Sequence, residues 1–465
     1  MRALTCAAML DVIKGILALI LYCVVAPALG AKLRGNRKRQ RWVFGLLVFA
    51  TSLHINKITF MIDSIQWYRG ATKGFEMSFL DVLSIALLIS GRNPVGRWFA
   101  PGAWLYLLYV GMSWISIFAA PEPVYVSMAG VRFVKAVVVY LAAYHFLREE
   151  EDLHVLMRAM AWTLIIQSFA VLKMKYVDHI YQVMGWFEHQ NALAMWAYMC
   201  GLPLLAVAMS TPTPPHLAKL YGFGYAATGI IVQASLSRAS LVFFALGSVA
   251  VMGVSLAERV TARKITFIGT LGLLAVVGLS LTWATVSARF KEDRNKESSE
   301  LRVLLIKASK LMLADSSIGL GWNNYALVIN PPWAYGDCID EWTIERGYTV
   351  DPEEAKPQPE SHYWLILAEN GYPGFISYML FLAVTLWWCF RSLLATWRTL
   401  WGTFLFGLLI ALTIQYYHST IERVLTQTKN LYMWLILLAF VARIEVWRKA
   451  ARAAQRAVAA GGGVA

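Results

Sequence analysis

The sequence predicts an all-α integral membrane protein, a polytopic bundle of about 12 to 13 transmembrane helices. Hydrophobic residues make up 58% of the 465 residues and charged residues only 15%, whereas a soluble domain carries about 25% charged residues. The mean hydropathy is +0.53. The 19 Trp and 21 Tyr residues fit a chain with many membrane–water boundaries, because their amphipathic rings concentrate there.

Apolar runs recur along the whole chain at the length that a membrane helix needs, roughly 20 residues for a bilayer core of about 30 Å. The expected spans are 12–30, 42–62, 78–91, 99–119, 131–147, 155–172, 191–209, 219–236, 239–257, 265–284, 374–390, 400–419 and 430–447. The short run at 78–91 is expected to be half-buried or merged with a neighbour. The run at 12–30 is too long for a cleavable signal peptide and lacks a convincing cleavage site.

The net charge of +14 is spread over short loops instead of forming one basic surface. Basic clusters lie at 31–41, 92–97, 259–264, 391–398 and after 443. If the spans alternate, these loops share one side of the membrane, and the positive-inside rule assigns that side to the cytoplasm. This distribution argues for contact with membrane lipids and against a nucleic-acid partner.

The same alternation divides the chain into four regions. Residues 1–284 and 374–449 form transmembrane helices, residues 285–373 form a long extracytoplasmic loop with surface helices, and residues 450–465 form a disordered tail. The long loop carries the acids Asp337, Asp340, Glu341, Glu345, Asp351, Glu353, Glu354 and Glu360. The basic loops lack such acids, which supports placing this loop on the opposite face.

One segment of the loop, 299–314, has apolar residues at the i, i+3, i+4 and i+7 spacing of an amphipathic helix. Ser298 or Ser299 is expected to cap it, and it is expected to lie along the membrane surface. The sequence Ile-Gly-Leu-Gly-Trp-Asn-Asn at 318–324 predicts a flexible turn after it.

The most informative segment, 361–374, reads Ser-His-Tyr-Trp-Leu-Ile-Leu-Ala-Glu-Asn-Gly-Tyr-Pro-Gly. It predicts a short helix over 362–369 that is broken near Gly371 before the next span. His362 therefore lies at a membrane boundary, where an imidazole serves as a general base near neutral pH. Glu369, two turns further on the same face, is expected to orient the ring or a neighbour. The alternative is an interfacial His that only hydrogen-bonds the loop.

Arginines on the same face predict an anionic ligand. Arg238 lies in a tight outer turn, Arg302 on the surface helix, and Arg289 where the long loop begins. A guanidinium group binds phosphate through two parallel hydrogen bonds, so a lipid pyrophosphate fits these residues. The alternatives are a turn arginine that reaches lipid headgroups, for Arg238, and an ordinary solvated helix face, for Arg302.

Glu188, His189 and Asn191 stand at the outer entrance of the span at 191–209. Asn191 is a candidate helix cap, while two adjacent side chains are weak evidence for a metal ion. The expected metal and cofactor content is therefore none. Aromatic residues crowd the long loop at Trp322, Trp333, Tyr335, Trp342, Tyr348 and Trp364. They suit a glycan-binding groove, and equally plain interfacial anchoring.

The order of these motifs resembles the O-antigen ligase and O-antigen polymerase superfamily of bacterial envelope glycan assembly. The shared elements are Gly-x-x-x-His-x-Asn-x-x-Ala at 185–194, Ser-Arg-Ala at 237–239, Ile-Gly-Leu-Gly at 318–321, and His362 followed by Leu-Ala-Glu-x-Gly-x-x-Gly at 367–374. The resemblance covers about residues 180–445, and the N-terminal third matches only in general character. Tyr363 stands where the family often has Asn.

The resemblance implies a membrane glycosyltransferase of the GT-C type, in the bacterial inner membrane with its active site facing the periplasm. Such an enzyme moves a glycan from undecaprenyl pyrophosphate to an acceptor hydroxyl, without a metal ion. By position, His362 would be the catalytic His, and Arg238 and Arg302 would bind the pyrophosphate. Direct displacement would invert the anomeric carbon.

Several functions share these motifs. A ligase that uses the lipid A-core of lipopolysaccharide is slightly favoured, because the chain ends soon after its last span. A polymerase acting on a growing glycan and a protein O-oligosaccharyltransferase remain open. A lipid-linked glycan flippase is the alternative of another class, since Asp11, Lys14, Lys57 and Asp81 lie in or beside spans. No internal repeat supports an inverted-repeat transporter, and an inactive scaffold is the last option.

Overall fold

The computed structural model describes residues 12–53, 58–60, 72–91, 96–291, 294–350 and 355–461. The first part of the chain forms a helix over Val12–Leu33 that contains the π-helical turn η1 (Leu21–Val25) and α2 (Ala26–Leu33), then α3 (Arg37–Ala50), α4 (Phe79–Ser90), α5 (Ala103–Trp114), the 3-10 turn η2 (Ile115–Ala119), α6 (Pro123–Phe146) and α7 (Glu150–Tyr176). The middle part forms α8 (Gln190–Met209), α9 (Pro215–Ser235), α10 (Arg238–Glu258) and α11 (Ala262–Lys291). The last part forms α12 (Arg294–Asp315), α13 (Tyr325–Val328), η3 (Ala334–Gly336), α14 (Asp337–Glu345), α15 (His362–Ala395), α16 (Leu400–His418) and α17 (Thr428–Gly461).

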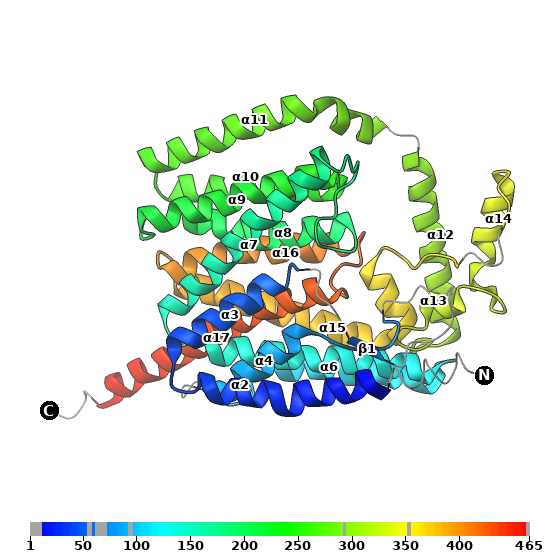
Figure 1. Cartoon of the computed structure of the whole chain (residues 1–465), viewed down its shortest axis with the longest axis horizontal. Helices are drawn as coiled ribbons and strands as arrows, with labels where there is room; N and C mark the ends of the chain where they lie inside the picture. Colours follow the sequence, from blue (N-terminus) through cyan, green and yellow to red (C-terminus); the bar gives the residue numbers. More distant parts are fainter. Residues whose placement is uncertain are drawn as a thin grey trace.

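The predicted all-α membrane fold is confirmed. Within the described ranges, nine helices are long and apolar enough to cross a membrane. The helices α3, α4, α5 and α9 pack among them, but they do not meet the same criterion of length and hydropathy, so fewer spans are found in the described ranges than the 12 to 13 that the apolar runs predict. The long helices lie side by side, and α12, α13 and α14 gather at one end of them (Figure 1).

Helix α8 forms the centre of the bundle, where it contacts α7, α9, α10, α16 and α17. Its most apolar stretch is 100% buried, whereas that of α11 is 0% buried. The helix carries no charged residue and has many small ones, and small residues let membrane helices approach closely. Gly201 shows this, because a Cβ atom there would lie 2.4 Å from the hydroxyl of Thr228 on α9. The edge position of α11 is visible in Figure 1.

The predicted span at 42–62 is wrong in its second half. Helix α3 ends at Ala50, and Thr51 and Ser52 turn their hydroxyls back onto the preceding carbonyls of Val48 and Phe49. A strand β1 (Ile58–Phe60) then pairs with β2 (Phe75–Met77) in antiparallel register, Ile58 opposite Met77. The apolar run therefore consists of a helix end and a strand, which hydropathy alone does not separate.

Three helix boundaries also differ from expectation. Helix α11 runs on to Lys291, past the predicted end at 284. Helix α12 begins at Arg294, so Ser298 and Ser299 lie inside the helix and do not cap it. Helix α17 continues to Gly461, where a disordered tail was predicted, because Ala and Arg are strong helix formers. Residues 462–465 lie outside the described ranges.

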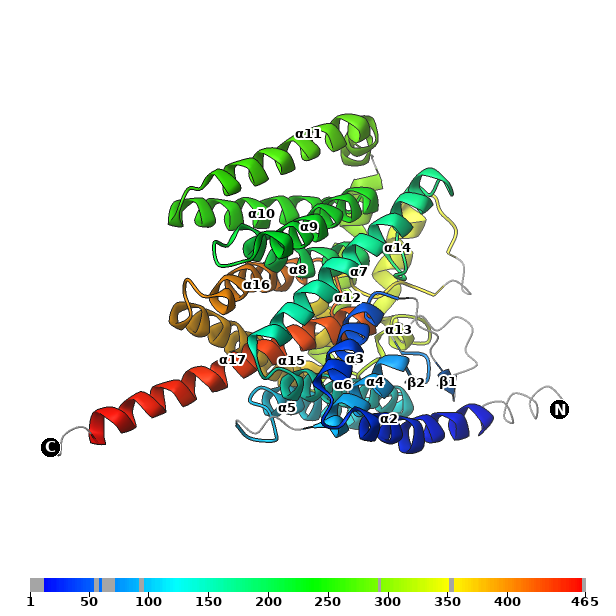
Figure 2. The same cartoon turned by 60° about the vertical axis from the view of Figure 1, so that its left-hand side comes forward.

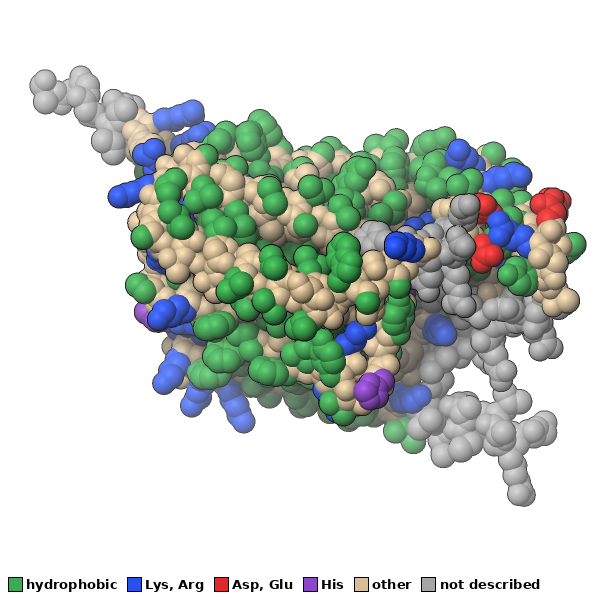
Figure 3. Space-filling view, turned by 90° about the horizontal axis from the view of Figure 1, so that it is seen from above, with side chains coloured by type: hydrophobic (Ala, Val, Ile, Leu, Met, Phe, Trp, Pro, Cys, Tyr) green, Lys and Arg blue, Asp and Glu red, His purple; other side chains and the backbone are tan. Residues whose placement is uncertain are grey.

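The basic loops meet at one end of the bundle. Arg37 pairs with Asp152 at 2.5 Å, and Ser392 donates to Glu445 at 3.1 Å. Arg263 donates to the main-chain oxygen of Ala208 at 2.9 Å. Figure 3 shows Lys and Arg side chains gathered at its left-hand end, while acidic side chains on the face shown lie at the other end. We call the first the basic end and the second, which carries α12 to α14, the outer end.

A kink in α15 joins this helix to the turn that follows α12. Gly371 has φ 59° and ψ −163°, which breaks the helix as the sequence predicts. Leu320 and Gly321 donate their main-chain N–H groups to the carbonyls of Ala368 and Glu369, at 2.9 and 3.0 Å. The turn thus satisfies carbonyls that the kink releases, and this pairing holds the first two turns of α15 at the outer end.

We expect Gly371→Ala to destabilise the protein, because a Cβ atom there would lie 2.2 Å from the carbonyl oxygen of Ser317. The backbone strain and the clash together cost on the order of 3 kcal/mol. The measurement is the thermal unfolding midpoint of the detergent-purified protein. Gly111→Ala is the control, since nothing lies within 4 Å of its added Cβ, and it should melt like the wild type or slightly higher. Equal midpoints for both variants would contradict this account of the kink.

Candidate active site

His362 is the first residue of α15, and the structure fixes both its backbone and its ring. Its main-chain N–H donates to the carbonyl of Ser419, just past α16, at 3.0 Å. The side chain is 2% exposed, and Nε2 lies 3.0 Å from the hydroxyl of Tyr378. The Nδ1 atom has no hydrogen-bond partner among the described residues. A buried polar atom without a partner is uncommon, and it marks a position where a ligand group can bind.

Arg302 and Asn191 come together through a shared acid. Arg302 on α12 pairs with Glu360, and its Nη2 lies 3.7 Å from Oε1 of Glu422. The amide of Asn191 donates to the same Glu422 oxygen at 2.5 Å. Two of the residues singled out in the sequence therefore meet at the loop between α16 and α17, although they are far apart along the chain.

We call the cluster formed by Arg302, Glu360, Glu422 and Asn191 the corner. Arg423 is a further charged residue of this corner, and the sequence analysis did not identify it. Its guanidinium donates to Gln358, and its charge interacts with Glu369, Glu360 and Glu422. The same charge acts on His362. The missed signal was an adjacent acid and base, Glu422 and Arg423, in a short outer loop between two apolar runs.

Glu369 has a different role from the expected one. Its Oε1 accepts the main-chain N–H of Tyr325 at 3.2 Å, so it binds the start of α13 and does not orient the ring of His362. The residue is 5% exposed. A carboxylate that accepts from the N-terminus of a helical turn is a stabilising arrangement, and here it fixes the loop beside the site.

The expected cap at the entrance of α8 is also different. His189, and not Asn191, is the N-cap, and its Nδ1 accepts the main-chain N–H of Asn191 at 3.2 Å. Burial lowers the pKa of His189, while the charge of Glu360 raises it and so opposes that shift. In the described part of the chain, His189 and Glu188 belong to no group of three His, Cys, Asp or Glu side chains suited to a metal ion.

Arg238 begins α10 at the same end of the bundle. The rings of Phe243, further along α10, and His418 lie 4.8 Å apart, and His418 directly precedes Ser419. Arg238 is partly buried and lies five residues before Phe243 on the same helix. Arg289 lies near the C-terminal end of α11, but its side chain is outside the described part of the structure.

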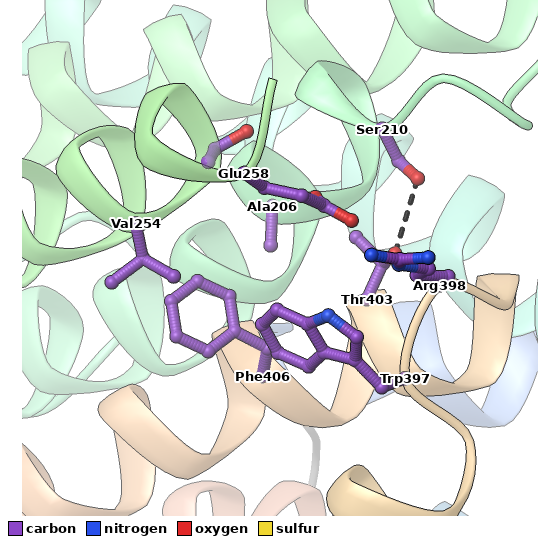
Figure 4. Close-up of a pocket in the computed structure, with 9 residues that line it drawn as sticks. Ala206, Ser210, Val254, Glu258, Trp397, Arg398, Thr403 and Phe406 are labelled. Carbon is purple, nitrogen blue, oxygen red and sulfur yellow. Dashed lines mark hydrogen bonds between the residues drawn. The ribbon is translucent and has the colours of Figure 1, made fainter.

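A small cavity lies at the opposite, basic end of the bundle. It has a volume of about 30 Å³ and is lined by Ser210, Glu258, Trp397, Arg398 and Thr403 among others. Figure 4 shows the hydroxyls of Ser210 and Thr403 joined by a hydrogen bond, which spans 3.1 Å. Since the space holds about one water molecule, it is too small for a glycan or a lipid and is separate from the site at His362.

Comparison with known proteins supports the family resemblance. Residues 223–379 match the family model Wzy_C, described as O-Antigen ligase. A search of curated proteins found no match. The matched segment is about a third of the chain, it contains Arg238, Arg302 and His362, and over these residues the protein is similar to the O-antigen ligase family. Together with the nine apolar helices of the described ranges, this match indicates a multi-pass membrane protein that is similar, over this segment, to membrane glycosyltransferases acting on lipid-linked glycans.

The pKa of Glu422 supplies a test of this corner. Burial and then the charge of Glu360 raise the pKa of Glu422 from 4.5 to about 7. Because the folded-state pKa exceeds the unfolded one, the folded state loses stability as the pH rises from about 5 to 7. We therefore expect the thermal midpoint of the wild type to fall relative to Glu422→Gln from about pH 5 through the folded-state pKa, and the difference to level off about one pH unit above that pKa.

The matched control is Glu341→Gln, which changes an exposed acid on α14. Its midpoint should follow that of the wild type at every pH between 5 and 8, since Glu341 is exposed and lies outside the cluster around Glu422. A difference between wild type and Glu422→Gln that does not change with pH would show that Glu422 is not a buried carboxyl of raised pKa.

Proposed function

We propose that this protein is a metal-independent, inverting glycosyltransferase that moves a glycan from undecaprenyl pyrophosphate to an acceptor hydroxyl of the lipid A-core. The outer end of the bundle would face the periplasm, and the basic end the cytoplasm of the inner membrane. The observation that carries this proposal is the buried His362 at the outer end, whose Nδ1 has no hydrogen-bond partner in the described part of the chain.

The proposed step requires a base and fixed positive charge. Nδ1 of His362 takes the proton of the acceptor hydroxyl, and the acceptor oxygen attacks the anomeric carbon from the face opposite the leaving group. The bond from that carbon to the pyrophosphate oxygen breaks, and undecaprenyl pyrophosphate leaves with the negative charge. Guanidinium groups held in place before the reaction stabilise this charge without reorganising.

The donor pyrophosphate would bind between α10 and α12. Arg302 has 35% of its side chain exposed, so it can exchange the carboxylate of Glu360 for a phosphate oxygen. Arg238 at the start of α10 would bind the second phosphate group, aided by the free N–H groups of that helix end. Arg289 would join them from the end of α11. Glu360 and Glu422 hold the site in the absence of donor.

Because His362 is only 2% exposed, the acceptor needs an opening before it can reach Nδ1. The segment 355–361, which lies between α14 and α15, and α12 are the elements that would move. The exchange of Arg302 from Glu360 to the donor pyrophosphate would break one contact that ties them together. Donor binding would therefore precede acceptor access.

The ligase remains in competition with a glycan polymerase and a protein O-oligosaccharyltransferase, since all three use the same chemistry. The flippase alternative receives no support from Asp81. This residue caps the start of α4 through Ser78 N–H at 2.9 Å and pairs with Lys135 at 3.0 Å, so it has a structural role. Asp11 and Lys57 lie outside the described ranges.

The deciding experiment is reconstitution of the full chain with a glycan on undecaprenyl pyrophosphate and three acceptors in separate reactions. A shift of the lipid A-core on a gel identifies a ligase, a ladder of products a polymerase, and a modified protein an oligosaccharyltransferase. Movement of the donor across the bilayer without any product would contradict the proposal.

We expect His362→Ala and His362→Gln to insert normally and to lose turnover by a factor of about 100 or more, which is the contribution of a positioned base. Product formation per minute and a monodisperse size-exclusion profile are the measurements. His216→Ala changes an exposed histidine on α9 near the basic end and should keep full turnover. Near-normal turnover of both His362 variants would remove this residue from the mechanism.

We also expect Arg302→Gln and Arg423→Gln to reduce turnover by about 10- to 100-fold, since each removes positive charge near the departing pyrophosphate. The control is Arg346→Gln. Arg346 lies just past α14 and pairs with Glu297 at 3.1 Å. It is therefore an arginine at the outer end whose ion pair does not involve Glu422. Equal turnover in all three variants would show that these charges do not act on the donor.

A further inference from the structure

A second binding site lies between α3 and α7, near the basic end and away from His362. These two helices pack against each other and start at the same end of the bundle, as Figure 2 shows. Between them runs a groove of about 860 Å³. The size is that of a ligand-binding site, because such sites typically have about 300–1,000 Å³.

The groove is polar at one end and apolar along the rest. Lys38 and Arg41 on α3 and Arg158 on α7 line its polar end, with Glu151 as the one acid. Arg41 is also paired with Glu149 and, at 3.1 Å, with Asp152, neither of which lines the groove, and Arg158 is paired with Glu151. Lys38 takes part in no ion pair within the described chain. The lining therefore has a surplus of positive charge, and the arginines retain donors for a further anion.

Beyond the charged end, the lining is apolar and aromatic. Trp42 and Phe49 on α3 and Trp162 and Ile166 on α7 line this part. From Lys38 the lining extends about 16 Å along α3, and on α7 it covers about 22 Å, at a rise of ~1.5 Å per residue. The apolar part alone, from Trp42 to Phe49, covers about 10 Å of α3. One leaflet of a bilayer core is about 15 Å thick, so the apolar part extends over most of a single leaflet.

The groove opens to the surface of the bundle that faces the membrane. Trp42 is 74% exposed and Trp162 is 53% exposed. A tryptophan beside a cationic end is typical of the membrane–water boundary, and basic pockets between membrane helices on the cytoplasmic side bind anionic lipid headgroups. A soluble ligand would not require an apolar face of this length.

We propose that this groove binds an anionic phospholipid of the leaflet at the basic end. Lys38, Arg41 and Arg158 bind the headgroup phosphate, and the acyl chains lie between Trp42 and Trp162 down to the middle of the bilayer. The site selects anionic over zwitterionic lipid, because the lining carries more cations than acids. It does not depend on glycan transfer, which takes place at the other end of the bundle.

The test uses tryptophan fluorescence of the full chain in nanodiscs with brominated lipids, whose bromine atoms quench nearby indoles. The signal of the groove is the difference between wild type and the double variant Trp42→Phe with Trp162→Phe. We expect brominated phosphatidylglycerol to quench this component at a mole fraction about tenfold lower than brominated phosphatidylethanolamine. Added salt should reduce the difference, because it screens the headgroup contact.

The paired variant is Lys38→Gln with Arg158→Gln, and its control is Lys32→Gln with Arg259→Gln. Both pairs remove two positive charges near the basic end, but Lys32 and Arg259 do not line the groove. We expect the preference for phosphatidylglycerol to fall severalfold in the first pair only. Equal quenching by the two lipids in the wild type, or an unchanged preference in the first pair, would overturn the proposal.

Discussion

The hydrogen bond from the main-chain N–H of His362 to the carbonyl of Ser419 is the contact on which the site depends. It places the first turn of α15 against the loop between α16 and α17, where Glu422 and Arg423 lie. Helix α12 reaches the same loop through Arg302. Three segments that are distant in sequence thus supply one imidazole, two guanidinium groups and their acids to a single corner.

Charged side chains connect the segments of that corner, although burial makes an ionised group there energetically unfavourable. Burial opposes ionisation of Glu422, and the adjacent acid Glu360 opposes it further. Structures keep such groups only if partners compensate them, and here the partners are Arg302, Arg423 and Asn191. The ion pairs of Arg302 with Glu360 and Glu422 are contacts that a phosphate group could replace, because phosphate also accepts hydrogen bonds from a guanidinium group.

The sequence predicts those parts of the fold that depend on local composition. Spanning length identifies the bundle helices, and the glycine of the 361–374 segment marks the kink at Gly371. It does not predict that Glu369 binds the N–H of Tyr325, nor that Arg423 donates to Gln358, because both contacts join segments whose separation is set by the tertiary fold. The sequence does not predict the strand at Ile58–Phe60 either. The reason is that hydropathy does not distinguish a short apolar strand from the end of an apolar helix.

Helix α11 carries the feature with the widest mechanical consequence. It has 30 residues, or about 45 Å of helix, and no residue of its most apolar stretch is buried by the rest of the described chain. A helix longer than the hydrocarbon core tilts to match it. Because α12 follows α11 in the chain, a thicker or thinner bilayer would change this tilt and, with it, the position of Arg302 relative to Glu422.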